Sequence, residues 1–100
     1  MIDIYEDAYE VNTKKSIIGA TNEALSNLRI DWRFEVDRYA RPEDGDQLWR
    51  VYFFDFDKSR KRVKGSLELY DPYSKPDEKW YTCCGAEITQ LLQGLILKTD

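Results

Sequence analysis

The sequence predicts an α+β fold in which an N-terminal and a C-terminal helix pack on one face of an antiparallel sheet of three or four strands. Two segments, one near each end of the chain, carry apolar residues at helical spacing. The segments between them alternate apolar and polar residues, and polar turns separate them. One sheet and two amphipathic helices form a two-layer core, so we expect both helices on the same face.

The composition suits a single domain of residues 1–100, because 42% of the residues are hydrophobic and 34% are charged. No apolar run approaches the roughly 18 to 20 residues that cross a membrane, and Met1 leads directly into acidic residues. We therefore expect no membrane partner and a cytoplasmic location. The adjacent residues Cys83 and Cys84 are poorly placed to pair with each other, and two free thiols suit a reducing compartment.

The residues that usually carry catalysis are scarce. Histidine is absent, which removes the commonest general base and metal ligand. We expect Cys83 and Cys84 to stand just before a helix and to act as packing thiols, since they lack a basic partner. Asp55 and Asp57 share one side of a strand and support an alternative, a small metal-dependent enzyme, but Asp57 stands where a nuclease-like pattern has lysine. We expect no enzyme, no metal and no cofactor.

The first eleven residues contain four acids and no basic residue; the acids are Asp3, Glu6, Asp7 and Glu10. Apolar residues among them match helical spacing, whereas Ile2 and Ile4 alone would suit a short strand. We favour a helical turn or an extension of the next helix.

That next helix is predicted from about Thr13 to Leu28, with Asn12 or Thr13 as its N-cap. Its apolar stripe consists of Ile17, Ile18, Thr21, Ala24, Leu25 and Leu28. A tight turn at Leu28 and Arg29 should join it to the first strand.

The first strand is predicted over Arg29 to Tyr39, where apolar and charged residues alternate almost perfectly. The apolar side consists of Ile30, Trp32, Phe34 and Val36. Arg41 to Asp46 contains an Asp-Gly pair and predicts a hairpin turn into the central strand, Leu48 to Asp57.

The central strand is apolar on both faces. We place Trp49, Val51 and Phe53 against the helices, because none of these side chains carries a hydroxyl group that would need a hydrogen-bond partner in the core. The outward aromatic residues are then Tyr52, Phe54 and Phe56. Exposed apolar patches usually mark interaction sites, so we expect a partner, a second copy in a homodimer or the N-terminal segment to cover them.

After a polar turn, a third strand is predicted from about Arg62 to Tyr70, with Val63, Leu67 and Leu69 inward and Arg62, Lys64, Ser66 and Glu68 outward. Lys79 to Cys83 is a candidate for a short fourth strand. The C-terminal helix is predicted from Ala86 to Leu97, with its stripe at Ile88, Leu91, Leu92 and Leu95.

Charge is predicted to separate along the molecule, because successive turns of an up-and-down sheet lie at alternate ends. The N-terminal acids, the first turn with Glu43, Asp44 and Asp46, and the later acids Asp71, Asp77 and Glu78 should share one end. Such an acidic end predicts a non-enzymatic inhibitor or immunity-type protein that occupies a basic surface of a protein partner, including a nucleic-acid-binding protein.

The alternative binding function uses the opposite charge. The basic turn from Lys58 to Lys64 suits a nucleic-acid-binding module, and the order of elements is shared, at the level of fold alone, with the double-stranded-RNA-binding domain. The net charge of −4 and the lack of a basic helix start argue against this function.

Overall fold

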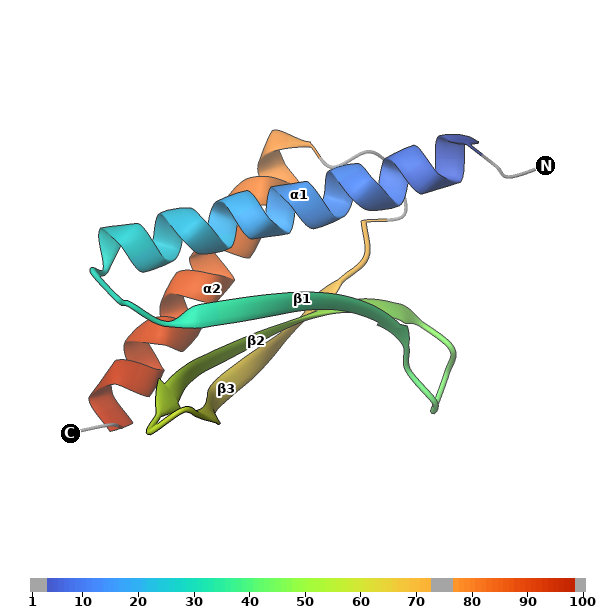
Figure 1. The fold of residues 1–100 in the computed structure, drawn as a ribbon. Coiled ribbons are helices and arrows are strands. Elements are labelled where there is room, and N and C mark those ends of the chain that lie inside the picture. The colour runs from blue at the N-terminus through green and yellow to red at the C-terminus, as the bar shows by residue number, and fades with distance from the viewer. Residues whose placement is uncertain (1–3, 73–76, 99–100) are drawn as a thin grey trace.

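The computed structural model describes residues 4–72 and 77–98, with side chains for residues 11–72 and 77–97. The element order is α1 (Ile4–Asn27), β1 (Arg33–Ala40), β2 (Gln47–Asp57), β3 (Arg60–Tyr70) and α2 (Glu78–Lys98). Both helices lie on the same side of the sheet (Figure 1), and no described element covers its other side. The predicted α+β fold is confirmed.

Helix α1 is one continuous helix, so the prediction that residues 4–11 extend it is confirmed, and the predicted N-cap at Asn12 or Thr13 is wrong. The buried stripe of this helix was predicted to begin at Ile17. It begins one turn earlier, at Thr13, whose side chain is buried. Thr21 is buried as well, and its hydroxyl donates to the Ile17 carbonyl at 2.7 Å, which satisfies it inside the core.

A Schellman motif ends α1 and confirms the predicted tight turn at Leu28 and Arg29. The Ile30 amide donates to the Leu25 carbonyl at 2.9 Å, and Arg29 has a φ of 55°, at the position that glycine usually occupies. Ile30 and Trp32 then pack against the core before β1 begins, so the strand starts later than the predicted Arg29.

The sheet is antiparallel with the order β1-β2-β3, and Val51 on β2 pairs with Val36 on β1 and with Leu67 on β3. The predicted hairpin at Arg41 to Asp46 is confirmed by the Gly45 amide, which donates to the Arg41 carbonyl at 2.7 Å. The hairpin places β1 beside the central strand along its whole length.

The predicted inward set of the central strand is confirmed, since Trp49, Val51 and Phe53 are buried in the cluster formed with the two helices. The cluster also contains Ile17, Ala20, Ala24, Leu25, Val36, Leu69, Cys84, Ile88 and Leu92. Gly65 on β3 is part of this packing because a Cβ there would lie 2.8 Å from the Leu95 side chain of α2. The face of the sheet that carries Phe53 is therefore its inner face.

The prediction that Val63 faces inward is wrong, because β3 carries a bulge. Phe53 pairs with Gly65, but the next residue, Phe54, pairs with Val63, which leaves Lys64 as the extra residue. The bulge turns Val63 to the outer face, where 62% of it is exposed. It also turns Lys64 inward, against prediction, and its ammonium lies 3.2 Å from Asp55.

The predicted fourth strand at Lys79 to Cys83 is also wrong, because these residues form the first turns of α2. Asp77 caps this helix by accepting the Trp80 amide at 2.8 Å. Trp80 and Cys84 extend the stripe of Ile88 at four-residue spacing, so the core begins six residues before the predicted start at Ala86.

Candidate interaction surfaces

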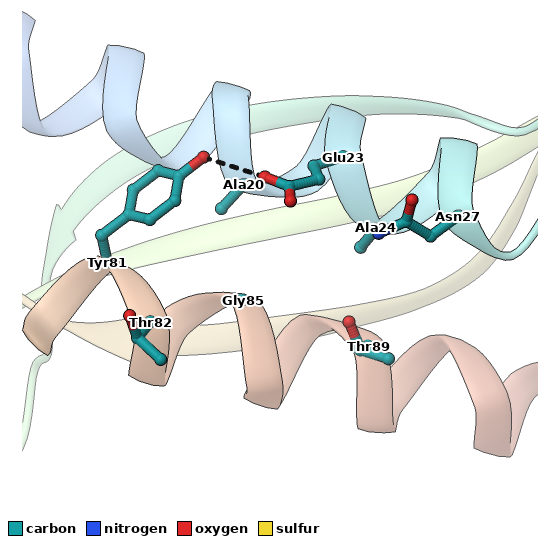
Figure 2. Close-up of a pocket in the computed structure, with 8 residues that line it drawn as sticks. All are labelled: Ala20, Glu23, Ala24, Asn27, Tyr81, Thr82, Gly85 and Thr89. Carbon is teal, nitrogen blue, oxygen red and sulfur yellow. Dashed lines mark hydrogen bonds between the residues drawn. The ribbon is translucent and has the colours of Figure 1, made fainter. Parts of the chain in front are cut away.

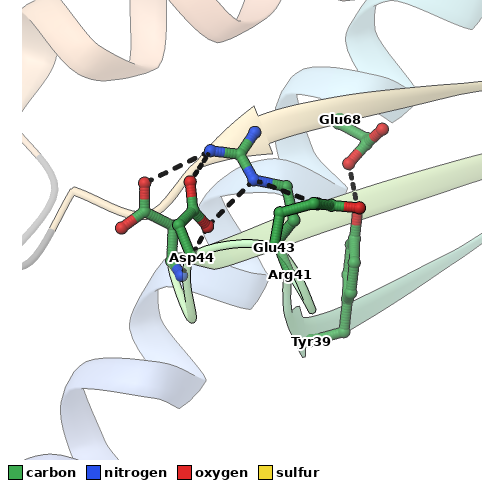
Figure 3. A network of polar contacts seen from close by, with 6 residues as sticks. Tyr39, Arg41, Glu43, Asp44 and Glu68 are labelled. Atoms are coloured by element: carbon green, nitrogen blue, oxygen red, sulfur yellow. Dashed lines mark hydrogen bonds and ion pairs between the residues drawn. The ribbon is translucent and has the colours of Figure 1, made fainter.

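The β1–β2 hairpin carries three carboxylates around one guanidinium (Figure 3). Arg41 Nε donates to Asp44 at 3.0 Å, and Arg41 Nη2 also contacts Asp44 and lies 3.4 Å from Asp46. Glu43 lies 3.7 Å from Arg41 Nε and is 75% exposed. The hydrogen bond from Arg41 lowers the pKa of the Asp44 carboxyl, so this group stays ionised at neutral pH.

The backbone of the hairpin fixes these carboxylates in place. The Asp46 amide donates to the Asp44 carboxylate at 3.0 Å, which closes a turn of the Asx type. Gly45 supplies the residue with a φ of 73° that this turn requires. The predicted residues Glu43, Asp44 and Asp46 therefore form one ordered acidic tip, the acidic hairpin, which Arg41 organises.

The other acids predicted for this end lie outside the acidic hairpin. Asp71 is buried and Asp77 caps α2, so the prediction that Asp71 belongs to the acidic surface is wrong. Asp3 lies outside the described residues. Glu6, Asp7 and Glu10 lie in α1, whose backbone is described there but whose side chains are not.

The two hairpin turns of the sheet lie at opposite ends of the molecule, as the up-and-down order predicts. The start of α1 and the acidic hairpin lie toward one end, and the β2–β3 turn lies at the other (Figure 1). That turn and the start of β3 carry Lys58, Arg60, Lys61, Arg62 and, at the bulge, Lys64. Asp57 and Asp55 of β2 lie directly across from Arg60 and Arg62. The separation follows from antiparallel pairing, which sends consecutive turns to opposite ends of β2.

The outer face of the sheet presents the predicted aromatic residues Tyr52, Phe54 and Phe56, but their exposures differ. Phe54 is 6% exposed because Lys61 Nζ lies 4.2 Å from its ring centroid and Phe56 meets it edge-on at 5.8 Å between centroids. Phe54 is thus covered within its own chain, whereas Phe56 is 47% exposed and partly open to a partner.

Arginine side chains line the same outer face, and the sequence analysis did not single them out. Arg33 lies over the Phe56 ring at 4.7 Å, and Arg50 lies over Tyr39 at 4.1 Å and donates to the Tyr52 hydroxyl at 2.5 Å. Strand alternation could have predicted which face these side chains occupy. Arg33 and Tyr39 of β1 pair with Phe54 and Leu48, which belong to the outer face of β2. Tyr39 also hydrogen-bonds Glu68 across the sheet (Figure 3).

A groove of about 240 Å³ lies between α1 and α2 (Figure 2). Small residues, among them Ala20, Ala24 and Gly85, line it, and Tyr81 closes one side by donating to Glu23 at 3.4 Å. Burial and the nearby Glu23 carboxylate raise the pKa of Tyr81, so its hydroxyl remains a donor. This volume is below that of typical ligand pockets, and we assign the groove to helix packing.

The basic turn is a two-residue hairpin loop whose central residues, Lys58 and Ser59, have φ angles of 53° and 71°. Two left-handed residues are the signature of a type I′ turn, which favours Asn-Gly. Replacing Lys58-Ser59 with Asn-Gly should raise the free energy of unfolding by about 1 kcal/mol, measured by urea unfolding. Ser66→Gly within β3 serves as control and should lower it; a less stable Asn-Gly variant would contradict the turn geometry.

The cysteines lie within α2 rather than just before it, which corrects their predicted position, and both are free thiols. Cys83 is exposed and Cys84 is buried, and burial raises the pKa of Cys84 to about 12. Treatment with a chromogenic disulfide reagent at pH 8 should therefore modify one thiol quickly, and the second after denaturant is added. Cys83→Ser should abolish the fast phase; two equally fast thiols would contradict the packing.

Within residues 4–72 and 77–98, no group of three or more Cys, Asp or Glu residues is arranged to hold a metal ion. Asp55, one of the two strand carboxylates considered for this chemistry, pairs with Lys64 instead. Neither helix, over its described length, is long and apolar enough to cross a membrane. No protein-family model, curated protein or solved structure matches the chain.

Proposed function

We propose that this protein is a non-catalytic binding protein that inhibits or neutralises a macromolecular partner by occupying a basic surface on it. The acidic hairpin is the observation that supports this proposal. Its three carboxylates face one guanidinium, which leaves two net negative charges on an ordered tip. Ordering before binding reduces the conformational entropy that association would otherwise lose.

The charge of the hairpin acts first on the encounter between the partners. A local concentration of one sign steers a complementary surface and raises the association rate more than the final affinity. The favoured partner is a protein with a basic surface, including one that normally holds nucleic acid. A cytoplasmic location belongs to the same proposal, because the exposed free thiol of Cys83 suits a reducing compartment.

The partner can be captured from the native host with the tagged chain and identified by mass spectrometry. Association rates of the purified pair are then compared for the wild type and Glu43→Lys at several salt concentrations. Glu43 is the suitable position because it is 75% exposed and, unlike Asp44, does not close the turn. We expect the association rate to fall about tenfold at low salt and the difference to shrink as salt rises.

The matched control is Glu87→Lys, which makes the same charge change at an exposed position of α2. It should leave the association rate within about twofold of the wild type. Equal rates for the Glu43 variant and the wild type would contradict a role for the hairpin.

The outer sheet face supports a second binding mode within the same class of function, a homodimer through the open side of β2. The exposed ring of Phe56 is the observation that favours it. Sedimentation velocity over a range of concentrations tests the dimer, and Phe56→Glu should remove it. A wild-type chain that stays monomeric at high micromolar concentration would exclude this mode.

A further inference from the structure

We propose that two copies of this chain stack their outer sheet faces with the β2 strands antiparallel, so that Asp37 of each copy meets Arg33 of the other. The inference rests on the homodimer named above as a second binding mode. It adds the orientation of the two copies and the charges that select this orientation. It does not depend on the function proposed for the acidic hairpin.

The strand register arranges the outer face in five rows of side chains. Counting from the acidic hairpin, the rows are Tyr39-Leu48-Tyr70, Asp37-Arg50-Glu68, Glu35-Tyr52-Ser66, Arg33-Phe54-Val63 and, past the start of β1, Phe56-Lys61. The acids lie in the second and third rows, whereas the fourth and fifth rows carry cations only. The face therefore changes from net negative near the acidic hairpin to net positive near the β2–β3 turn.

Two charges on the β1 side of this face lack a counter-charge in their own copy. Asp37 and Arg33 are exposed, and neither forms an ion pair with the residues that the structure describes. They lie four residues apart on β1, about 13 Å, which is too far for them to pair with each other. Glu35 differs, since Lys61 of the same copy lies 2.9 Å from it. Asp37 and Arg33 are therefore the charges that a second copy can neutralise.

A symmetric pair of aligned sheets that stack face to face has a twofold axis either across the strands or along them. With the axis across the strands, through the middle row, each strand stacks on its own copy in the opposite direction. The second row then lies over the fourth row of the other copy, so Asp37 faces Arg33 twice in the dimer. Stacked sheets lie about 10 Å apart, a gap that an aspartate and an arginine side chain bridge together.

The other arrangement, with the axis along the strands, brings like charges together. Each row would lie over the same row of the second copy, with β1 over β3. Arg50 would then face Arg50, and Asp37 would face Glu68. The two acidic hairpins would also lie at the same end of the dimer. Like charges placed opposite each other destabilise an interface, so the charges of the face select the antiparallel stack.

The antiparallel stack also covers exposed aromatic rings. Phe56, which is 47% exposed, lies over the first row of the second copy, where Tyr70 is 65% exposed. Tyr52 meets Tyr52 of the second copy at the axis. Glu35 meets its own copy there too, but each Glu35 brings the counter-charge of Lys61. Aromatic residues are enriched at the centres of protein interfaces, which this arrangement reproduces.

The outer face is large enough for a stable dimer. The eleven residues of β2 span about 35 Å at 3.3 Å per residue. Three strands at a spacing of about 4.8 Å are about 14 Å wide, so each copy contributes about 500 Å². The two copies together bury about 1,000 Å², which reaches the lower limit of specific interfaces.

Sedimentation velocity with fluorescence detection tests the orientation on the full chain. The tracer is Asp37→Arg labelled at Cys83, an exposed thiol of α2, which lies on the other side of the sheet. Asp37→Arg and Arg33→Asp should each self-associate at least about tenfold more weakly than the wild type, since each places like charges opposite each other twice. A mixture of the two should associate within about threefold of the wild type, because both contacts then join opposite charges.

The matched control mixes the tracer with Lys15→Asp, which makes the same charge change at an exposed position of α1. This variant keeps Arg33, so it should bind the tracer at least about fivefold more weakly than Arg33→Asp does. Circular dichroism establishes folding of every variant. Should either member of the pair fail to fold, Asp37→Lys and Arg33→Glu replace Asp37→Arg and Arg33→Asp, because they make the same exchange of charge.

Three results would overturn the proposal, and they differ in what else they remove. A wild-type chain that stays monomeric at high micromolar concentration would exclude the second binding mode as well, while the proposal for the acidic hairpin would stand. A wild-type dimer that Phe56→Glu removes, with no association in the mixture of Asp37→Arg and Arg33→Asp, would exclude the antiparallel stack alone. Equal binding of the tracer to Lys15→Asp and Arg33→Asp would show that net charge, not this contact, drives association.

Discussion

Replacing Asp71 with alanine should lower the free energy of unfolding by about 3 kcal/mol. The Asp71 side chain is 0% exposed, accepts the Trp49 indole N–H at 2.7 Å and lies 3.5 Å from Arg38 Nε. Alanine would leave a buried indole donor without this acceptor and a half-buried guanidinium without this counter-charge. Urea unfolding followed by circular dichroism measures the loss.

Two further variants separate the hydrogen bond from the charge. Asp71→Asn keeps an acceptor for the indole and should cost less than alanine. Trp49→Phe removes the donor, so Asp71→Ala should cost less in that background than in the wild type. Strictly additive losses in this double-mutant cycle would show that the two side chains are not coupled.

The sequence predicted the elements whose signal is local. The hairpin at Arg41 to Asp46 follows from an Asp-Gly pair between two alternating segments, and the inner face of β2 follows from Trp49 and Phe53. The acidic hairpin could be anticipated from composition. Its ordering could not, because it depends on the distances from one guanidinium, Arg41, to three carboxylates.

The errors arose where tertiary packing overrides a local pattern. Val63 fits perfect alternation, but the bulge that turns it outward is defined by its pairing with Phe54 on another strand. Trp80 and its neighbours fit a short strand by propensity, yet the cap at Asp77 and the continuing stripe make them helical. The local sequence of Asp71 predicts an exposed loop. Its burial depends on the hydrogen bond from Trp49, which lies 22 residues earlier in the sequence.

Two phenylalanines on the central strand should differ sharply when each is shortened to alanine. Phe53 lies at the centre of the core with 0% exposure, and its ring lies 6.4 Å from that of Phe34. Phe53→Ala should lower the free energy of unfolding by about 3 to 5 kcal/mol, since it leaves a cavity beneath both helices. Because small domains are stable by about 5 to 15 kcal/mol, this is a large share of the total.

Phe56→Ala is the matched control, because it removes the same atoms three residues later on the same strand. Its ring is 47% exposed on the outer face, where solvent fills the space that alanine leaves, so the expected loss is below about 1 kcal/mol. Urea unfolding of the two variants side by side measures the difference. Equal losses for the two variants would mean that the outer face is buried in solution. A loss for Phe56→Ala alone that grows with protein concentration would show that a second copy of the chain buries it.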